Sequence, residues 1–169
     1  LPDDEVTSED RALVHWYNQT QVSDAWRTTI DGTQVSDSAY FEDLSTGLGN
    51  SSQTHLRQHV DFEYFDHTWS ALLRLEDYQT IDDSLTDVER PYQRLPQVSV
   101  AGYWPNNPLN LDYRLQSELT YFHRDTGTTG LRANLRPQVS LPLRLGPLFV
   151  ESLAAFDYEA SARTTIEAT

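Results

Sequence analysis

Histidines are the residues of this chain with the widest chemical repertoire, and two of the five lie in one strand-like segment. His55 and His59 alternate onto the same side as Asp61. Along an extended strand, residues four apart are separated by about 13 Å and residues two apart by about 7 Å. Such spacings are too wide for one tetrahedral metal site unless other strands supply ligands. We therefore predict no metal site among these residues.

Nucleophilic and cofactor chemistry have no recognisable pattern either. Ser, His and Asp are plentiful, but no G-x-S-x-G elbow that would present a serine nucleophile occurs. The absence of Cys excludes disulfides, thiolate metal sites and a cysteine nucleophile. The seven glycines are scattered and form no phosphate-binding loop. We expect neither a catalytic site nor a cofactor.

The chain is strongly acidic, and all of its basic residues are of one type. Twelve basic residues, all Arg, stand against 26 Asp and Glu, which gives a formal net charge of −14. Nucleic-acid phosphates would be repelled by such a surface, so nucleic acid is not an expected partner. Asp82, Asp83, Asp87 and Glu89 cluster in one polar stretch. This cluster either binds divalent cations or only keeps a loop solvated, and the sequence leaves both readings open.

These residues must be positioned by strands, because the dominant pattern has a period of two. Between Leu109 and Tyr121 the odd positions are Leu, Leu, Tyr, Leu, Ser, Leu and Tyr, whereas every even position is polar. A strand places these two sets on opposite faces, and a helix would mix them. The same alternation recurs, strongly or weakly, at Ala12–Gln19, Ala25–Thr33, Leu56–Tyr64, Thr68–Tyr78, Gln97–Trp104, Leu131–Arg144 and Leu148–Tyr158. The sequence therefore predicts about eight strands.

The connections between these strands are expected to alternate in length. Short turns are predicted near Val22–Asp24, at Asp66-His67, at Pro105–Pro108 and at Gly146-Pro147, and longer loops at Ser36–Thr54, Thr80–Pro96 and His123–Thr129. Short turns at one end and long loops at the other are typical of up-and-down outer-membrane barrels. Pro137 and Pro142 cannot donate to a strand ladder, so we expect a bulge there or a strand end near Pro142.

Strand length and polarity favour a membrane barrel over a soluble sheet. The mean hydropathy is −0.59 and no apolar run approaches the length of a membrane helix, but barrel strands present only every second side chain to lipid. Thirteen tilted residues from Leu109 to Tyr121 exceed the nine to eleven or so that cross a hydrocarbon layer. The predicted fold class is all-β: an antiparallel, up-and-down transmembrane β-barrel segment. Its polar side, with Asp112, Arg114, Glu118 and Arg132, is expected to face a watery lumen.

Several strings also resemble one family, in the order in which that family carries them. Val35–Leu44 resembles a loop-proximal "VSD..YF.D" signature, and Trp26-Arg27 is similar to the segment before it. Arg90–Gln97 resembles a "Y...PQ" strand entry, and Thr129–Arg132, Arg136-Pro137 and Ser140–Leu143 resemble a "TR….P…SLPL" pattern. Together these strings resemble the lipopolysaccharide-assembly outer-membrane protein family LptD, also called OstA.

The resemblance implies a function that periodicity alone does not. Family members form a barrel of about two dozen strands behind a periplasmic domain, receive lipopolysaccharide from the periplasmic Lpt bridge and deliver it to the outer leaflet. A lipoprotein, LptE, plugs the lumen. The expectation is thus a translocon, not an enzyme, in the outer membrane of a Gram-negative bacterium, with lipopolysaccharide, LptE, the bridge components and outer-membrane lipids as partners. Residues 1–169 would be one part of that barrel, with the periplasmic domain and the remaining strands outside this chain.

Two alternatives remain open at this point. The first is a self-contained eight-stranded outer-membrane barrel that serves as an anchor or adhesin; the polar ending Ile166–Thr169 speaks against it. The second is a soluble carbohydrate-binding β-domain that uses its four tryptophans as stacking platforms, namely Trp16, Trp26, Trp69 and Trp104. On the barrel reading, Asp112, Arg114, Glu118 and Arg132 are the candidates for contact with the plug or the passing glycolipid.

Overall fold

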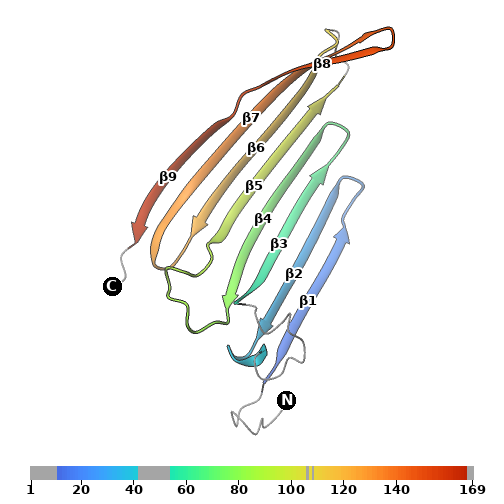
Figure 1. The fold of residues 1–169 in the computed structure, drawn as a ribbon. Helices are drawn as coiled ribbons and strands as arrows, with labels where there is room; N and C mark the ends of the chain where they lie inside the picture. Colours follow the sequence, from blue (N-terminus) through green and yellow to red (C-terminus); the bar gives the residue numbers. More distant parts are fainter. Residues whose placement is uncertain (1–10, 42–53, 106, 108, 167–169) are drawn as a thin grey trace.

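The fold is one open, curved antiparallel sheet (Figure 1). The computed structural model describes residues 11–41, 54–105, 107 and 109–166. Within these residues the strands are β1 (Leu13–Gln21), β2 (Trp26–Val35), β3 (His55–Phe65), β4 (Trp69–Thr80), β5 (Gln93–Trp104), β6 (Asp112–His123), β7 (Gly127–Leu145), β8 (Leu148–Ala155) and β9 (Tyr158–Ile166). Each strand from β1 to β7 pairs with the next along the chain, and β9 also pairs with β7. The all-β, antiparallel fold class is as predicted.

The ninth strand was not predicted as a separate element, and Pro137 explains it. Both β8 and β9 pair with β7, and their registers continue one another, from Gln138 opposite Ala155 to Leu135 opposite Tyr158. The break at Phe156-Asp157 therefore faces Pro137, which has no N–H to donate to the ladder. The Phe156 amide still donates to the Pro137 carbonyl at 3.0 Å. β8 and β9 are thus two halves of one long strand.

Other boundaries depart from the prediction. β7 continues through Pro142 to Leu145, so the expected strand end near Pro142 is wrong. Residues 141–145 pair only with β8, and the β7–β8 hairpin extends past the neighbouring hairpin (Figure 1). The connection predicted as a long loop at His123–Thr129 has only three residues, 124–126, whereas that predicted as a short turn at Pro105–Pro108 runs from 105 to 111. Asn110 adopts a positive φ of 54° in it. Residues 106 and 108, and 42–53 of the predicted loop at 36–54, lie outside the described part.

The register sorts side chains into two faces. The apolar face carries, among others, Ile30, Val60, Phe62, Leu73, Val98, Val100, Leu115, Leu119, Leu131 and Leu135. Many of these are exposed in the isolated sheet, including Leu73 at 37% and Leu119 at 42%. At the end where β1–β2, β3–β4 and β5–β6 are joined, this face carries packed aromatic pairs: Trp26 with Tyr64 (centroids 5.0 Å apart) and Trp69 with Trp104 (4.8 Å). We call this end the turn end, and the opposite one the loop end.

A small hydrophobic core lies at the loop end. Val35, Phe41, Leu56 and Ile81 are buried there, and Tyr40 packs against them. The Gln79 side chain holds the end of β2, because its amide oxygen accepts from the Val35 N–H (3.0 Å) and its amide nitrogen donates to the Val35 carbonyl (2.8 Å). The described residues contain no helix with the length and hydropathy of a membrane span.

Candidate functional site: the polar face of the sheet

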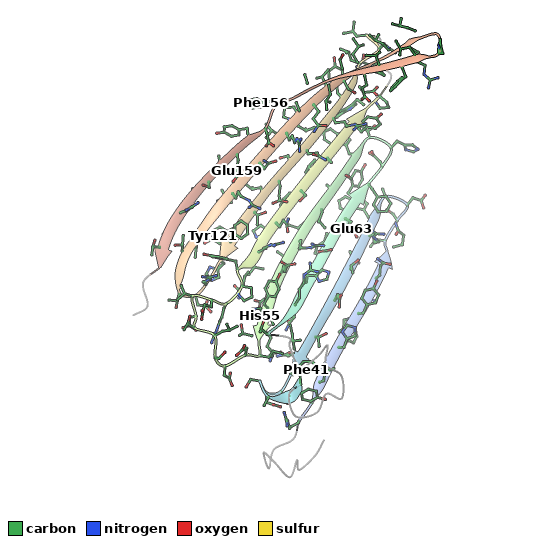
Figure 2. All side chains as sticks on the ribbon, in the orientation of Figure 1. Phe41, His55, Glu63, Tyr121, Phe156 and Glu159 are labelled. Atoms are coloured by element: carbon green, nitrogen blue, oxygen red, sulfur yellow. The ribbon has the colours of Figure 1, made fainter. Side chains whose placement is uncertain are left out.

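The face opposite the apolar one carries nearly all the charge in the strands. Cross-strand partners on it include Arg27 with Glu63, Asp61 with Arg74, Glu76 with Arg94, Arg114 with Gln138 and Thr120 with Arg132. Figure 2 shows side chains on both sides of the sheet and labels Glu63 on β3 and Glu159 on β9 of this polar face. The strands thus separate an apolar surface from a charged one that spans the whole sheet.

Two bidentate ion pairs connect β2, β3 and β4. Arg27 donates to both carboxylate oxygens of Glu63, from Nε at 2.7 Å and from Nη2 at 2.8 Å. Arg74 does the same to Asp61, at 2.8 and 2.7 Å, and His59 Nε2 lies 3.8 Å from an Asp61 oxygen. Asp61 is only 5% exposed, so its charge is desolvated and depends on Arg74. Fork-shaped arginine contacts of this kind fix geometry as well as charge.

Glu76 is the most deeply buried carboxylate of this face. It is 1% exposed and accepts hydrogen bonds from Arg57 Nε at 2.5 Å and from the Tyr78 hydroxyl at 2.9 Å. Arg94 Nε, from β5, lies 3.4 Å from its second oxygen. One carboxylate therefore joins β3, β4 and β5. The pairing of β4 with β5 shifts register just beside it, between Arg74 and Glu76.

Glu118 forms a similar centre on β5, β6 and β7. Its carboxylate accepts from Gln97 Nε2 (3.0 Å), from the Thr120 hydroxyl (3.0 Å) and from Arg132 Nη2 (3.3 Å). Thr120 is 1% exposed, so the middle of this face is well packed as well as polar. The sequence singled out Glu118 and Arg132, and the structure brings them into direct contact.

The other two predicted residues lie on the same face but not in that centre. The Arg114 guanidinium stacks over the Tyr103 ring, 5.0 Å from its centroid. Asp112 begins β6 and lies opposite Ser140 of β7. The four candidates therefore share a face, and Glu118 and Arg132 form an ion pair with each other. The sequence analysis placed Asp61 on one face with His55 and His59 but predicted no ion pair for it, and it did not single out Glu76, which alternation around Arg74 could have placed on this face.

Small side chains leave a depression between these charged centres. Ser70, Ser99 and Ala101 line a hollow of about 450 Å³ that is flanked by Glu63 and Glu118. A second hollow of about 420 Å³ adjoins it toward the turn end, where Ala101 and Arg114 contribute to its lining. Long side chains on either side and short ones between them give this face a shape that another molecule can occupy.

The acidic residues of the 81–92 loop are used as local hydrogen-bond acceptors. Asp82 accepts from the Ser84 hydroxyl and amide, and these bonds hold the pKa of Asp82 below its ordinary value. The Thr86 amide and hydroxyl do the same for the pKa of Glu89. Asp83 accepts from the Ser38 hydroxyl, and Asp87 lies 3.3 Å from Arg90. Each of these four carboxylates therefore has a hydrogen-bond or ion-pair partner in the loops.

Asp37, in the segment that follows β2, is another carboxylate of the loop end that is held by hydrogen bonds. Arg11 donates to both oxygens of Asp37, at 3.0 and 2.6 Å, and its guanidinium lies over the Tyr40 ring. The hydrogen bond from Arg11, followed by that from Ser36, holds the pKa of Asp37 below its ordinary value. Asp37 is therefore ionised at neutral pH. Its ion pair with Arg11 holds the segment that precedes β1 against the segment that follows β2.

Arg124 fastens the 81–92 loop to the turn between β6 and β7. Its two terminal nitrogens donate to the carbonyls of Val88 and Arg90, both at 2.6 Å, and its guanidinium lies 3.8 Å from the Tyr92 ring centroid. Next to it, Gly127 has a φ of +103°, a conformation that glycine adopts without strain, and faces Val88. One side chain thus ties a twelve-residue loop to a neighbouring turn.

Replacing Arg124 with Ala should release that loop without unfolding the sheet. Hydrogen bonds from a charged donor contribute roughly 1.5–3 kcal/mol, so amides of residues 81–92 should exchange about tenfold faster or more. Hydrogen exchange followed by mass spectrometry on the full-length protein measures this directly. Arg144→Ala is the control, because Arg144 lies at the other end of the sheet over Phe149. Unchanged exchange in 81–92 would contradict the fastening role.

The histidines and tryptophans do not form the sites that their chemistry permits. No group of three or more His, Cys, Asp or Glu in a metal-binding arrangement occurs in the part of the chain that the structure describes. His59 and Asp61 approach each other, but Asp61 is held by Arg74. Trp26, Trp69 and Trp104 lie on the apolar face at its turn end, and two of them pack on each other. A sugar site also needs polar side chains for the sugar hydroxyls, and the apolar face supplies few beside these rings, which disfavours the soluble carbohydrate-binding alternative.

Comparison with known proteins gives one consistent result. Residues 9–162 match the family described as LptD: LPS transport system D. The chain is 38% identical over 160 residues to the LPS-assembly protein LptD of Nitrosococcus oceani, covering 93% of this chain and 22% of that protein. It is 37% identical to that of Alcanivorax borkumensis (90% and 20%) and 34% identical to that of Hahella chejuensis (79% and 18%). The chain thus spans about a fifth of the length of these curated relatives. On these matches, and on the two-faced antiparallel sheet that accompanies them, the chain belongs to the LptD family.

Proposed function

We propose that this chain is part of the outer-membrane barrel of a protein that inserts lipopolysaccharide into the outer leaflet of a Gram-negative bacterium. The observation that carries the proposal is the near-complete separation of an apolar and a charged face along one antiparallel sheet, in a chain of the LptD family. The relatives that it matches are named LPS-assembly proteins. Transport of a finished glycolipid needs no covalent step, so the protein acts as a translocon and not as an enzyme.

On this proposal the apolar face contacts membrane lipid and the polar face lines the lumen. The apolar surface that the isolated sheet exposes is then covered by hydrocarbon, and the aromatic pairs of the turn end lie at one membrane interface, where Trp and Tyr are favoured. Short turns are typical of the periplasmic side of such barrels, which places the loop end outside the cell. The free edges of β1 and β9 are closed by further strands of the full-length protein.

The polar face then has two kinds of occupant. The plug lipoprotein LptE is the first, and the hollow at Ser70, Ser99 and Ala101 offers it room between charged centres. The passing glycolipid, received from the periplasmic Lpt bridge, is the second. Asp112, Arg114, Glu118 and Arg132 remain our candidates for these contacts.

Depletion of the full-length protein in its native cell is the test. New lipopolysaccharide should stop reaching the cell surface and accumulate inside, as measured by surface labelling of newly made glycolipid. Complementation with a variant that reverses all four charges keeps the Glu118–Arg132 pair in inverted form, and should lower both plug co-purification and surface delivery. Normal delivery after depletion would contradict the proposed function, and full activity of the reversed variant would remove these four residues from it.

A further inference from the structure

We propose that a groove around Gly32 on the apolar face binds a hydrocarbon chain of a membrane lipid, with the polar interfacial groups of that lipid at Gln58 and Asp77. This inference rests on the proposed function, because it requires that the apolar face contact lipid. It assigns a defined lipid-binding position to a surface that would otherwise make only non-specific contact with the lipid bilayer.

The groove runs across five strands near the loop end. It has a volume of about 390 Å³, and its lining reaches from β1 to Leu95 of β5. Since neighbouring strands are about 4.8 Å apart, it extends roughly 19 Å across the sheet. Its apolar wall is formed by Val14, Trp16, Ile30, Val60 and Leu75. Trp16 is 63% exposed, so its ring stands at the open end of the groove and is not packed into the sheet.

Gly32 forms the floor of this groove, and neither backbone geometry nor close packing demands a glycine there. Its φ is not in the left-handed region, and an added Cβ would meet Gln58 Cβ at 3.6 Å, an ordinary contact. Glycine within a strand weakens it, so an unneeded one calls for another role. Gly102 provides the contrast on the same face, because the Trp104 ring already covers it and leaves no room for a Cβ. At Gly32 the space stays open.

The chemistry along the groove changes from apolar to polar in a way that fits a lipid. Within the groove, the cross-strand row Ile30–Val60–Leu75 is apolar, and Asn18 of β1 continues this row outside the lining. The next row toward the loop end contains Gly32, Gln58 and Asp77, and Gln34 follows. Trp16 lies in this second row, opposite Gly32, and Trp favours membrane interfaces. A hydrocarbon chain matches the first row. In the second row the Gln58 amide can donate to an ester carbonyl of the lipid, and the Asp77 carboxylate suits a hydroxyl or a cationic headgroup such as choline.

The experiment uses the full-length protein in phosphatidylcholine vesicles that contain a phosphatidylcholine with a diazirine in one acyl chain. After illumination, labelled peptides are mapped by mass spectrometry. Peptides from the groove, around Gly32 and Val60, should be labelled several times more than peptides from the apolar face around Ser117. Gly32→Leu fills the groove and removes contact with about two methylenes, which should lower groove labelling roughly tenfold. Ser117→Leu adds apolar bulk elsewhere on this face and should leave groove labelling unchanged.

The possible outcomes separate this inference from the proposed function. Even labelling over the apolar face, unaffected by Gly32→Leu, would overturn the groove and leave the barrel in place. Labelling of the apolar face everywhere except in the groove would also overturn the proposed lipid site, because a protein segment or a second copy of the chain would then fill the groove. Absence of labelling anywhere on the apolar face would contradict the proposed function itself. The comparison of groove and Ser117 peptides in the unmodified protein needs no variant, so poor folding of Gly32→Leu would not leave the question open.

Discussion

Replacement of Glu76 with Ala should lower the free energy of unfolding by about 2–3 kcal/mol. Removing one partner of a fully buried ion pair costs roughly 3–5 kcal/mol, because the remaining charge is left without compensation. Glu76 is itself 1% exposed, but its partners Arg57 and Arg94 are 42% and 40% exposed, so water reduces the loss. The Tyr78 hydroxyl also loses its acceptor. Urea unfolding of the full-length protein in detergent micelles measures the change.

Glu159→Ala is the matched control for this prediction. Glu159 is an exposed carboxylate on the same face (Figure 2), on β9, and its removal should change the free energy of unfolding by no more than about 0.5 kcal/mol. Equal effects at the two positions would mean that net charge matters on this face and that the joining of three strands by Glu76 does not. A large loss at Glu76 alone would mean that the polar face stabilises the sheet, in addition to its proposed role of lining the lumen.

The strands were predictable because alternation is a local property. Residues two apart in a strand lie on the same face, so the segment Leu109–Tyr121 shows the alternation of apolar and polar residues without reference to the rest of the chain. β9 was missed because its apolar-face positions include Ala160 and Ala162, whose small side chains give little contrast with Ser161 and Arg163. The break opposite Pro137 was also invisible, since a missing donor on one strand interrupts the ladder of another.

The ion pairs were not predictable, because they depend on register. A two-residue turn at Asp66-His67 would pair Asp61 with Leu72. In the structure the Asp66 amide donates to the Trp69 carbonyl, and the side chain of Asp66 accepts from the amides of Thr68 and Trp69. The turn therefore centres one residue later, and Asp61 pairs with Arg74. A shift of one residue in the turn preserves the faces and changes every partner, which is why the faces were predicted and the networks were not.

Of two adjacent leucines in β4, only one should tolerate arginine. Leu73 lies on the apolar face between Phe62 and Val98, midway between Trp69 and Asp77. Leu72 lies on the polar face, opposite Glu63 and Ser99. If the apolar face contacts hydrocarbon, Leu73→Arg should destabilise the protein by about 2–4 kcal/mol, the cost of arginine near the middle of a bilayer on a barrel surface. Leu72→Arg places the same charge beside a carboxylate in water and should cost far less.

The two variants differ by one position in sequence, so length, composition and net charge are matched. Urea unfolding of each full-length variant in phosphatidylcholine vesicles gives the two free energies, and gel mobility before and after heating reports how much protein is folded. A soluble sheet, with its apolar surface in water, would give small and similar losses at the two positions, since arginine at the exposed Leu73 would then be harmless. A larger loss at Leu73 than at Leu72 is therefore expected only if lipid covers the face that carries Leu73, and equal losses would mean that neither face is in contact with the membrane.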